Sequence, residues 1–378
     1  MTEHNKDVTQ NYQPTPPLQH PANSNQSRND EINLTEFFYV LWKEKIQIIV
    51  ISLFFTIIAA LYAFTAQEWW SAKAKVIAPQ ITDFAEFRLQ VKQFQPAFDL
   101  YQDDGTILVN ETLDSLVEAE KLFEQFLYSF NSLANKKTYL HGSKDFQQFL
   151  TNNKIHSEEA INETLEIWFD KIKASQTDQS QDDVYSLSLQ AINSEQSYNM
   201  LNGYISYVSS KVYDDEINNL RAVVSAKKNE LSQTLTIFES QAKNNLEVEI
   251  QRTKYALEIA KSAQLTKPIQ NLGDKEIFAI NMGSDALAAK VKALESVNDF
   301  SLIDPRIQQV KAKLALLDQT KIKEDMKFDT YRFLENVEKP SSRDKPNRSL
   351  ILILGTLLGG MLAVPMVLIR HAFINSKK

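Results

Sequence analysis

The chain has 378 residues, no cysteine and a formal net charge of −7 at pH 7. The absence of cysteine excludes disulfide bonds, thiolate catalysis and cysteine-ligated zinc. Residues 67–349 carry a net charge of −8 and the two chain ends together carry +1, so the long central segment is not a nucleic-acid-binding surface.

The N-terminal residues 1–30 are predicted to be a disordered tail. They are rich in Asn, Gln and Pro and contain few large apolar side chains, a composition that cannot bury a core. Residues 31–45 then become amphipathic and lead into Trp42. We expect this second segment to lie along a membrane surface, where an amphipathic helix buries its apolar face.

Two apolar stretches without Asp, Glu, Lys or Arg, residues 46–66 and 350–369, predict two transmembrane helices. Each has about the twenty residues that a helix needs to cross the hydrocarbon layer. Each also contains twelve Leu, Ile, Val or Phe residues, which favour membrane insertion by on the order of several kcal/mol. The alternatives are two buried core helices or, for the first stretch, a signal peptide. A signal peptide is disfavoured because 45 mostly polar residues precede the stretch and Glu68-Trp69-Trp70 follow it.

The second apolar stretch contains Gly355, Gly359 and Gly360, a GxxxG pattern with an adjacent glycine. Small residues at this spacing let two membrane helices approach closely, so we expect a helix–helix contact here. The alternative is an unpaired helix that faces lipid. Pro340 and Pro346 precede the stretch and are expected to hold the chain extended as it enters the membrane.

The first part of the central segment predicts a small α/β domain. Apolar and polar side chains alternate at residues 72–78 and 185–191, which indicates strands, while apolar spacing by threes and fours indicates a helix over residues 110–133. A second helix, over residues 158–174, is predicted by Ser157 as its N-cap and by acidic residues in its first turn. The order strand, helix, helix, strand points to an α/β domain near the membrane.

A long helix over about residues 194–266 is predicted next, because residues 204–267 contain neither Gly nor Pro. It would be on the order of 100 Å long and is expected to project from the membrane. Its apolar stripe repeats better at eleven than at seven residues, which favours nearly straight or slightly right-handed packing. Asp304 is expected to cap a further helix, beginning at Pro305, that packs back along the long one. The stripe consists of Leu220, Val224, Leu231, Leu235, Phe238, Ala242, Leu246, Leu257 and Ala260.

The sequence predicts no catalytic, cofactor-binding or metal-binding residues. Its five His are scattered, without the spacing of a metal site, and it has no glycine-rich phosphate loop or GxSxG elbow. Adjacent carboxylates such as Asp182-Asp183 and Asp214-Asp215 are interpreted as solvated turns or helix faces. Basic residues near the two apolar stretches are equally numerous on both sides, so charge does not decide the orientation.

Several segments together carry a family resemblance. Glu31–Leu34 and Leu41–Lys45 precede the first apolar stretch, and Trp70–Pro79 follows it. With the prolines and glycines named above, they resemble the entry motif, first strand and second-span segment of the polysaccharide co-polymerases, the Wzz or chain-length determinant family of Gram-negative inner membranes. In the segment around the second span, some family members have more prolines than the two of this chain. The family members that set very long O-antigen chains resemble this chain most, both in its size and in its segment Leu201–Ile205.

This resemblance implies an α+β membrane protein in the bacterial inner membrane, with both termini (1–30 and 370–378) in the cytoplasm. Residues 67–349 would be periplasmic, with a membrane-proximal α/β base and a long projecting helix. It further implies ring-like homo-oligomers that act among membrane lipids with the O-antigen polymerase and the growing polysaccharide, and fix the modal chain length of lipopolysaccharide without catalysis or a cofactor.

Three alternatives to this function remain. The first is a chain-length regulator for another surface polysaccharide, and the second is a two-span membrane sensor, which usually needs a large cytoplasmic output domain. The third is an enzyme like the tyrosine-kinase branch of the same superfamily. That branch requires a phosphate-binding loop after the second span, which residues 371–378 are too few to supply.

Overall fold

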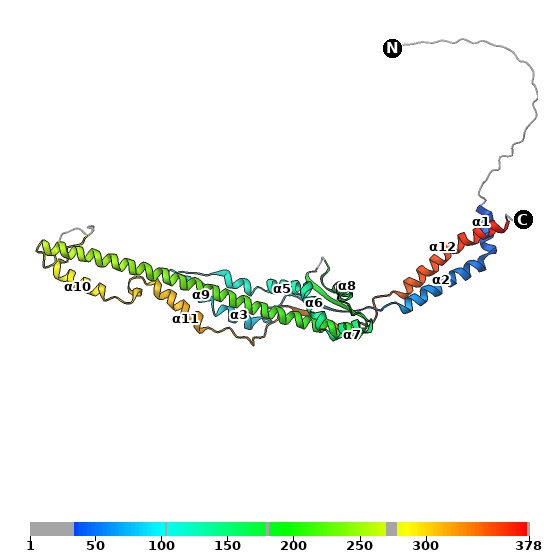
Figure 1. The fold of residues 1–378 in the computed structure, drawn as a ribbon, viewed down its shortest axis with the longest axis horizontal. Helices are drawn as coiled ribbons and strands as arrows, with labels where there is room; N and C mark the ends of the chain where they lie inside the picture. The colour runs from blue at the N-terminus through cyan, green and yellow to red at the C-terminus, as the bar shows by residue number, and fades with distance from the viewer. Residues whose placement is uncertain (1–33, 103, 179–180, 270–277, 376–378) are drawn as a thin grey trace, which may run out of the picture. The chain divides into compact units, whose positions relative to one another are not determined.

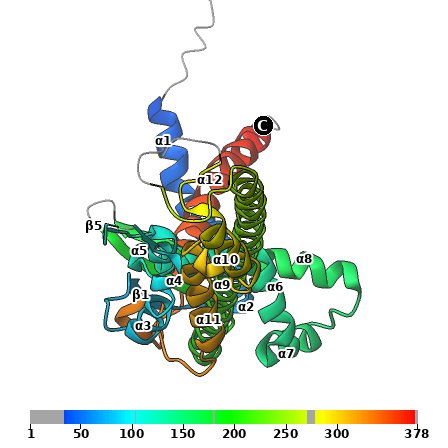
Figure 2. The same cartoon turned by 90° about the vertical axis from the view of Figure 1, so that its left-hand side faces the viewer.

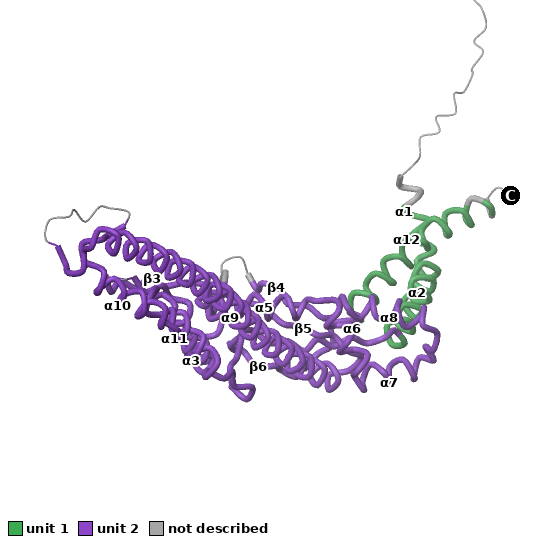
Figure 3. The backbone as a smooth tube through the Cα atoms, turned by 60° about the vertical axis from the view of Figure 1, so that its left-hand side comes forward, with its two compact units in different colours: residues 1–65, 348–378 green, residues 66–347 purple. Residues whose placement is uncertain are grey.

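The computed structural model describes residues 34–102, 104–178, 181–269 and 278–375, and the chain divides into two compact units (Figure 1). The first unit comprises residues 1–65 and 348–378, and the second comprises residues 66–347 (Figure 3). The predicted disordered tail lies outside the described residues. The expected fold class is confirmed, because two candidate membrane helices flank a domain of sheet and helices that contains one very long helix.

The first unit is a pair of long apolar helices preceded by a shorter one. Helices α2 and α12 are long and apolar enough to cross a membrane, and most of their side chains are not buried within the unit. Their positions match the two predicted stretches, although α12 begins two residues before residue 350 and continues past residue 369. The three helices are α1 (Leu34–Lys43), α2 (Lys45–Thr65) and α12 (Arg348–Asn375).

The second unit contains a four-stranded antiparallel sheet in the order β4-β5-β1-β6. Both predicted strands are confirmed, and they pair with each other, with Ala72 opposite Leu189. Ala72, Ala74 and Val76 are buried while Lys73 is exposed, as alternation on a half-buried strand requires. The strands are β1 (Trp70–Ile77), β4 (Ile172–Asp178), β5 (Gln181–Ala191) and β6 (Arg332–Glu338), with a separate hairpin of β2 (Leu100–Tyr101) and β3 (Ile107–Leu108).

Short helices surround this sheet, and two predicted helices need correction. The helix predicted over residues 110–133 is two elements, because the chain breaks at Val117, whose φ of −125° is not helical. The helix predicted over residues 158–174 ends at Phe169, since β4 begins three residues later. The helices are α3 (Ala85–Lys92), α4 (Gln95–Phe98), η1 (Glu111–Leu116), α5 (Ala119–Asn131), α6 (Leu133–Gly142), α7 (Lys144–Asn152) and α8 (Glu158–Phe169).

The cap predicted at Ser157 is present, whereas Asp304 lies one residue before the N-cap position of its helix. The Ser157 hydroxyl accepts a hydrogen bond from the Ala160 amide at 3.3 Å, at the start of α8. The Asp304 carboxylate accepts one from the Arg306 amide at 3.0 Å, and the helix that follows begins at Arg306 rather than at Pro305.

The long helix α9 (Ser194–Ser262) has 69 residues, and it runs past all three apolar clusters of the unit. It ends four residues before the predicted position. Helices α10 (Gly283–Glu295) and α11 (Arg306–Gln319) lie along it, as Figures 1 and 2 show, with the short η2 (Phe300–Leu302) between them. Leu231 of α9 and Val310 of α11 share one cluster, which confirms the predicted packing of the returning helix.

Candidate functional site

The two glycines of the GxxxG pattern lie at the contact between α12 and α2. A Cβ added at Gly355 would overlap the Cβ of Ala59. A Cβ added at Gly359 would lie 2.9 Å from the Phe55 Cβ and from the Ser52 Cα. Ordinary contacts between carbon atoms are about 3.5–4.0 Å, so only glycine permits this approach of the two backbones.

Hydroxyl groups join the same two helices between the glycines. The hydroxyl oxygens of Thr56 and Thr356 lie 3.0 Å apart, and the Ser52 hydroxyl donates to the Thr356 carbonyl oxygen at 3.1 Å. Gly360 lies outside this contact, since a Cβ there would meet no atom within 4 Å. The pattern therefore joins the two spans of a single chain through Gly355 and Gly359.

Polar contacts join both ends of this helix pair. The Arg370 guanidinium donates to the Gln47 side-chain oxygen at 2.8 Å at one end. At the other end the Arg348 guanidinium lies 4.4 Å from the Phe64 ring centroid and donates to the Ala63 carbonyl oxygen at 3.3 Å. The contact between α2 and α12 thus extends over nearly the whole length of the apolar segments.

The predicted proline segment connects β6 to the end of the second unit. The Pro340 carbonyl oxygen accepts a hydrogen bond of 2.7 Å from the Ser194 hydroxyl at the first residue of α9. The Lys345–Pro346 peptide is cis, and the Lys345 carbonyl oxygen accepts from the Trp69 amide at 2.9 Å. The segment is therefore joined both to the long helix and to the residue that precedes β1.

Aromatic side chains that sequence reasoning did not single out join the sheet to its helices. Trp168 of α8 is 1% exposed and packs edge-to-face on Trp69 and Phe146, with ring centroids 5.8 and 5.2 Å apart. The Lys171 ammonium lies 4.4 Å from the Trp69 ring centroid. Each of the two aromatic pairs adds about 0.5–1.5 kcal/mol of stability beyond the contribution of the area that it buries. They fix the position of the residues that enter β1.

Gly203 has a structural role within the Leu201–Ile205 segment. A Cβ at this position would lie 2.5 Å from the Tyr139 hydroxyl oxygen, which donates to the Met200 carbonyl oxygen at 2.9 Å. Burial, followed by the nearby Asp145 carboxylate, raises the pKa of Tyr139 to about 12. The glycine therefore lets a half-buried tyrosine of α6 dock against the first turns of α9.

A groove of about 580 Å³ lies between α9, α11 and the β2–β3 hairpin. Three cations lie over aromatic rings around it, the closest being Arg306 at 4.2 Å from the Phe238 ring centroid. Lys313 donates to the Asp99 carbonyl oxygen, and its pKa is lowered by burial and then by the nearby Lys227 ammonium. The groove can accept polar ligands, but its aromatic faces are already covered by the chain's own cations.

The described ranges contain no group of three or more His, Asp or Glu side chains that could hold a metal ion. The expectation that the chain has no catalytic, cofactor-binding or metal-binding residue stays a prediction. The geometry instead offers a closely packed pair of apolar helices, a helix of 69 residues and polar grooves beside that helix.

Comparison with known proteins finds a match to one family model and to several full-length relatives. The family model described as "Wzz: Chain length determinant protein" matches residues 30–125. "Ferric enterobactin transport protein FepE" of Escherichia coli (strain K12) is 26% identical over 360 residues, with 93% of this chain and 92% of that protein covered. "ECA polysaccharide chain length modulation protein" of the same organism is 25% identical over 359 residues, with 93% and 98% covered.

A solved structure described as "full-length bacterial polysaccharide co-polymerase" has the same fold. Its TM-score is 0.60 at 24% sequence identity, and the alignment covers 92% of this chain and 99% of that one. The alignment therefore extends over nearly the entire length of both chains.

Proposed function

We propose that this protein is a non-enzymatic regulator of O-antigen chain length in lipopolysaccharide, because residues 30–125 match the family model described as "Wzz: Chain length determinant protein". The observation that carries the proposal is the match to the family model in the segment that contains α2 and β1. The relative named for polysaccharide chain length modulation supports the chain-length part of the proposal, since it aligns over 93% of this chain.

The proposed arrangement puts the protein in the bacterial inner membrane with both termini in the cytoplasm and residues 67–349 in the periplasm. There it acts as a homo-oligomer with the O-antigen polymerase and the growing polysaccharide, among membrane lipids. Two spans that pack closely on each other within one chain support this proposal, because they give each subunit a compact anchor.

A regulator of another surface polysaccharide is an equally supported second candidate. The observation that favours it is the ECA-related protein, which is 25% identical and is covered over 98% of its length. The name of FepE refers to ferric enterobactin transport and belongs to that protein. Polysaccharide regulation is favoured over transport because the family description also names chain length.

The first experiment expresses the chain in a host that lacks its own chain-length regulators and displays both lipopolysaccharide and ECA polysaccharide on gels. We expect a new cluster of bands at a defined length in one of the two polysaccharides, and its identity decides between the two candidates. If both polysaccharides kept a random distribution of lengths while the protein was present in the membrane, both candidate functions would be refuted.

The mechanism that we propose is that the long helix sets how long a glycan stays engaged. Residues 240–250 of α9 begin directly after Glu239, which pairs with Lys311, and they include Glu249, which pairs with Lys290, so their deletion removes the second ion pair. The variant lacks these eleven residues and also residues 296–303 of the connection between α10 and α11. The deletion shortens α9 by about 16 Å and keeps its apolar face in register, since eleven residues make about three turns.

We expect this deletion to change the modal length in the gel assay. A matched control removes the same number of residues from the N-terminal tail, within residues 1–30. An unchanged modal length, with normal amounts of both proteins in the membrane, would refute the proposed role of the long helix.

A further inference from the structure

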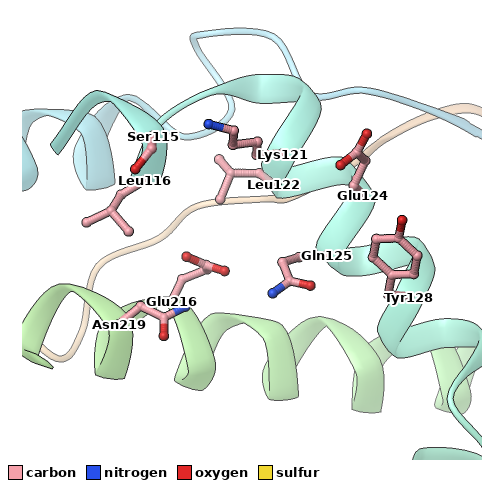
Figure 4. A pocket seen from close by; sticks show the side chains of 9 residues that line it. All are labelled: Ser115, Leu116, Lys121, Leu122, Glu124, Gln125, Tyr128, Glu216 and Asn219. Carbon is pink, nitrogen blue, oxygen red and sulfur yellow. The ribbon is translucent and has the colours of Figure 1, made fainter. Parts of the chain in front are cut away.

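A cavity of about 310 Å³ lies between α5 and α9 and is closed at one end by η1. Figure 4 shows Glu216 extending from α9 and Gln125 extending from α5 into the space between these helices. Binding cavities for small molecules are about 300–1,000 Å³, so this one holds a ligand about the size of one sugar ring.

Glu216 is the unusual residue of this cavity. It is 4% exposed, and burial raises its pKa, an effect that a hydrogen bond from Asn219 partly offsets. None of the ion pairs among the described residues includes it. A buried carboxyl group without a cationic partner destabilises a protein, and a ligand with hydroxyl donors would offset that penalty.

The remaining walls combine amide groups with apolar surface. Gln125 and Asn219 contribute exposed amides, while the buried Leu122 and the ring of Tyr128, which is 70% exposed, contribute apolar surface. The Lys121 ammonium belongs to the rim and forms an ion pair of 3.0 Å with Glu118. Sugars present hydroxyl groups at the ring edge and C–H groups on the ring face, so they match walls of both kinds.

We propose that this cavity binds one neutral sugar residue of the polysaccharide whose length the protein regulates. Glu216 accepts hydrogen bonds from two sugar hydroxyl groups, the amides bind at the sides, and Tyr128 covers one face of the ring. The inference rests on the proposed function for the identity of the ligand. Glu216 and Glu124 both line the cavity and oppose the single cation Lys121, so an anionic sugar is disfavoured.

The test uses the full chain in lipid nanodiscs and ligand-observed saturation-transfer NMR. The probes are methyl α-D-glucopyranoside, methyl α-D-galactopyranoside, N-acetyl-D-glucosamine and D-glucuronic acid. The variants are Glu216→Gln and Tyr128→Ala, and the second changes an exposed side chain and should leave folding intact. Asp214→Asn is the matched control, because Asp214 is an exposed carboxylate of α9 that does not line the cavity.

We expect at least one neutral probe to bind, glucuronic acid not to bind, and both cavity variants to weaken binding by about tenfold, because Glu216→Gln loses a hydrogen bond to a charged group and Tyr128→Ala loses the ring that covers the sugar. Asp214→Asn should bind like the native chain. The proposal is overturned if no neutral probe binds, or if binding persists in both cavity variants. A change of subunit number in Glu216→Gln without sugar binding would also overturn it and assign the cavity to a neighbouring copy.

The gel assay separates failure of this inference from failure of the proposed function. A banded polysaccharide ladder without sugar binding at the cavity would reject the inference and leave the function standing. Sugar binding at the cavity with unchanged ladders of both polysaccharides would reject the function and leave the cavity as a saccharide site.

Discussion

Replacing Gly355 and Gly359 together by Leu should separate the two membrane helices of the chain. A Cβ at Gly359 would lie 2.9 Å from the Phe55 Cβ, so the helices must move apart by about 0.6–1.1 Å to restore ordinary carbon contacts, and by more for a whole Leu side chain. The separation also breaks the hydroxyl contacts of Thr356 with α2, which contribute about 0.6 kcal/mol each and at most about 1.7.

Disulfide cross-linking measures this separation directly, because the chain has no cysteine of its own. The reporter pair is Thr56→Cys with Thr356→Cys, whose native hydroxyl oxygens lie 3.0 Å apart. A disulfide needs Cβ atoms about 3.5–4.5 Å apart, so a shift of more than about 1 Å suppresses it. We expect efficient intramolecular cross-linking in the reporter chain and strongly reduced cross-linking after both glycines are replaced.

Gly360→Leu is the matched control, because a Cβ at Gly360 meets no atom within 4 Å. It adds the same side chain to the same helix and should leave cross-linking unchanged. Equal cross-linking in all three proteins would refute the reasoning. A cross-linked dimer in place of the intramolecular product would show that the pattern joins different chains, and the double replacement should then weaken the oligomer.

Three further changes test the second unit. Glu216→Gln should raise the melting temperature at pH 7, and this gain should disappear as the pH falls to about 4. The reason is that a carboxyl group with a raised pKa costs stability only where it is ionised. A gain in melting temperature that does not depend on pH would contradict this prediction. Gly203→Ala should destabilise the chain by about 1–3 kcal/mol, and by much less in a Tyr139→Phe background, which lacks the clashing hydroxyl. A double-mutant cycle of unfolding free energies measures this coupling. Equal costs of Gly203→Ala in the two backgrounds would reject the clash. Trp168→Ala should lower the unfolding free energy by about 3–5 kcal/mol, whereas the exposed Tyr128→Ala should change it by less than about 0.5; similar losses would refute the assignment of the core.

The sequence predicts those elements whose packing leaves a periodic pattern. Strand β1 was predictable because one of its faces is buried and the other is not. Strand β6 was missed because Val337 is its only buried residue, so an edge strand of this kind shows no alternation. Helix α10 was also missed, and it begins at Gly283, whose φ of +76° marks a turn that only tertiary contacts specify.

The eleven-residue stripe of α9 is confirmed, and the series that begins at Leu220 has one more member than predicted. Leu220, Leu231 and Ala242 are all buried, and the next position in the series is Thr253, which is 4% exposed. Sequence reasoning passed over Thr253 because it is polar. Its hydroxyl donates to the Glu249 carbonyl oxygen of the preceding turn at 2.7 Å, so burial leaves this group satisfied.

The sites were less predictable than the fold, since they depend on which surfaces meet. The glycine spacing indicated a helix contact, but only the structure identifies α2 of the same chain as the partner of Gly355 and Gly359. Glu216 follows Asp214 and Asp215, which were interpreted as solvated, and no local pattern distinguishes it from them. It is buried because it faces α5 across the cavity, a tertiary contact with no periodic signature.

Stability and binding together decide what the Glu216 carboxyl group does. If it only filled space, Glu216→Gln would keep the shape of the side chain, remove the ionisation penalty and leave every other property unchanged. If it binds a sugar hydroxyl, the same variant should be more stable at pH 7 and yet bind the sugar more weakly. Opposite changes in stability and binding are the usual mark of a group that a functional site holds in an unfavourable environment. Melting temperature and saturation transfer measured on one preparation of each protein therefore separate the two roles.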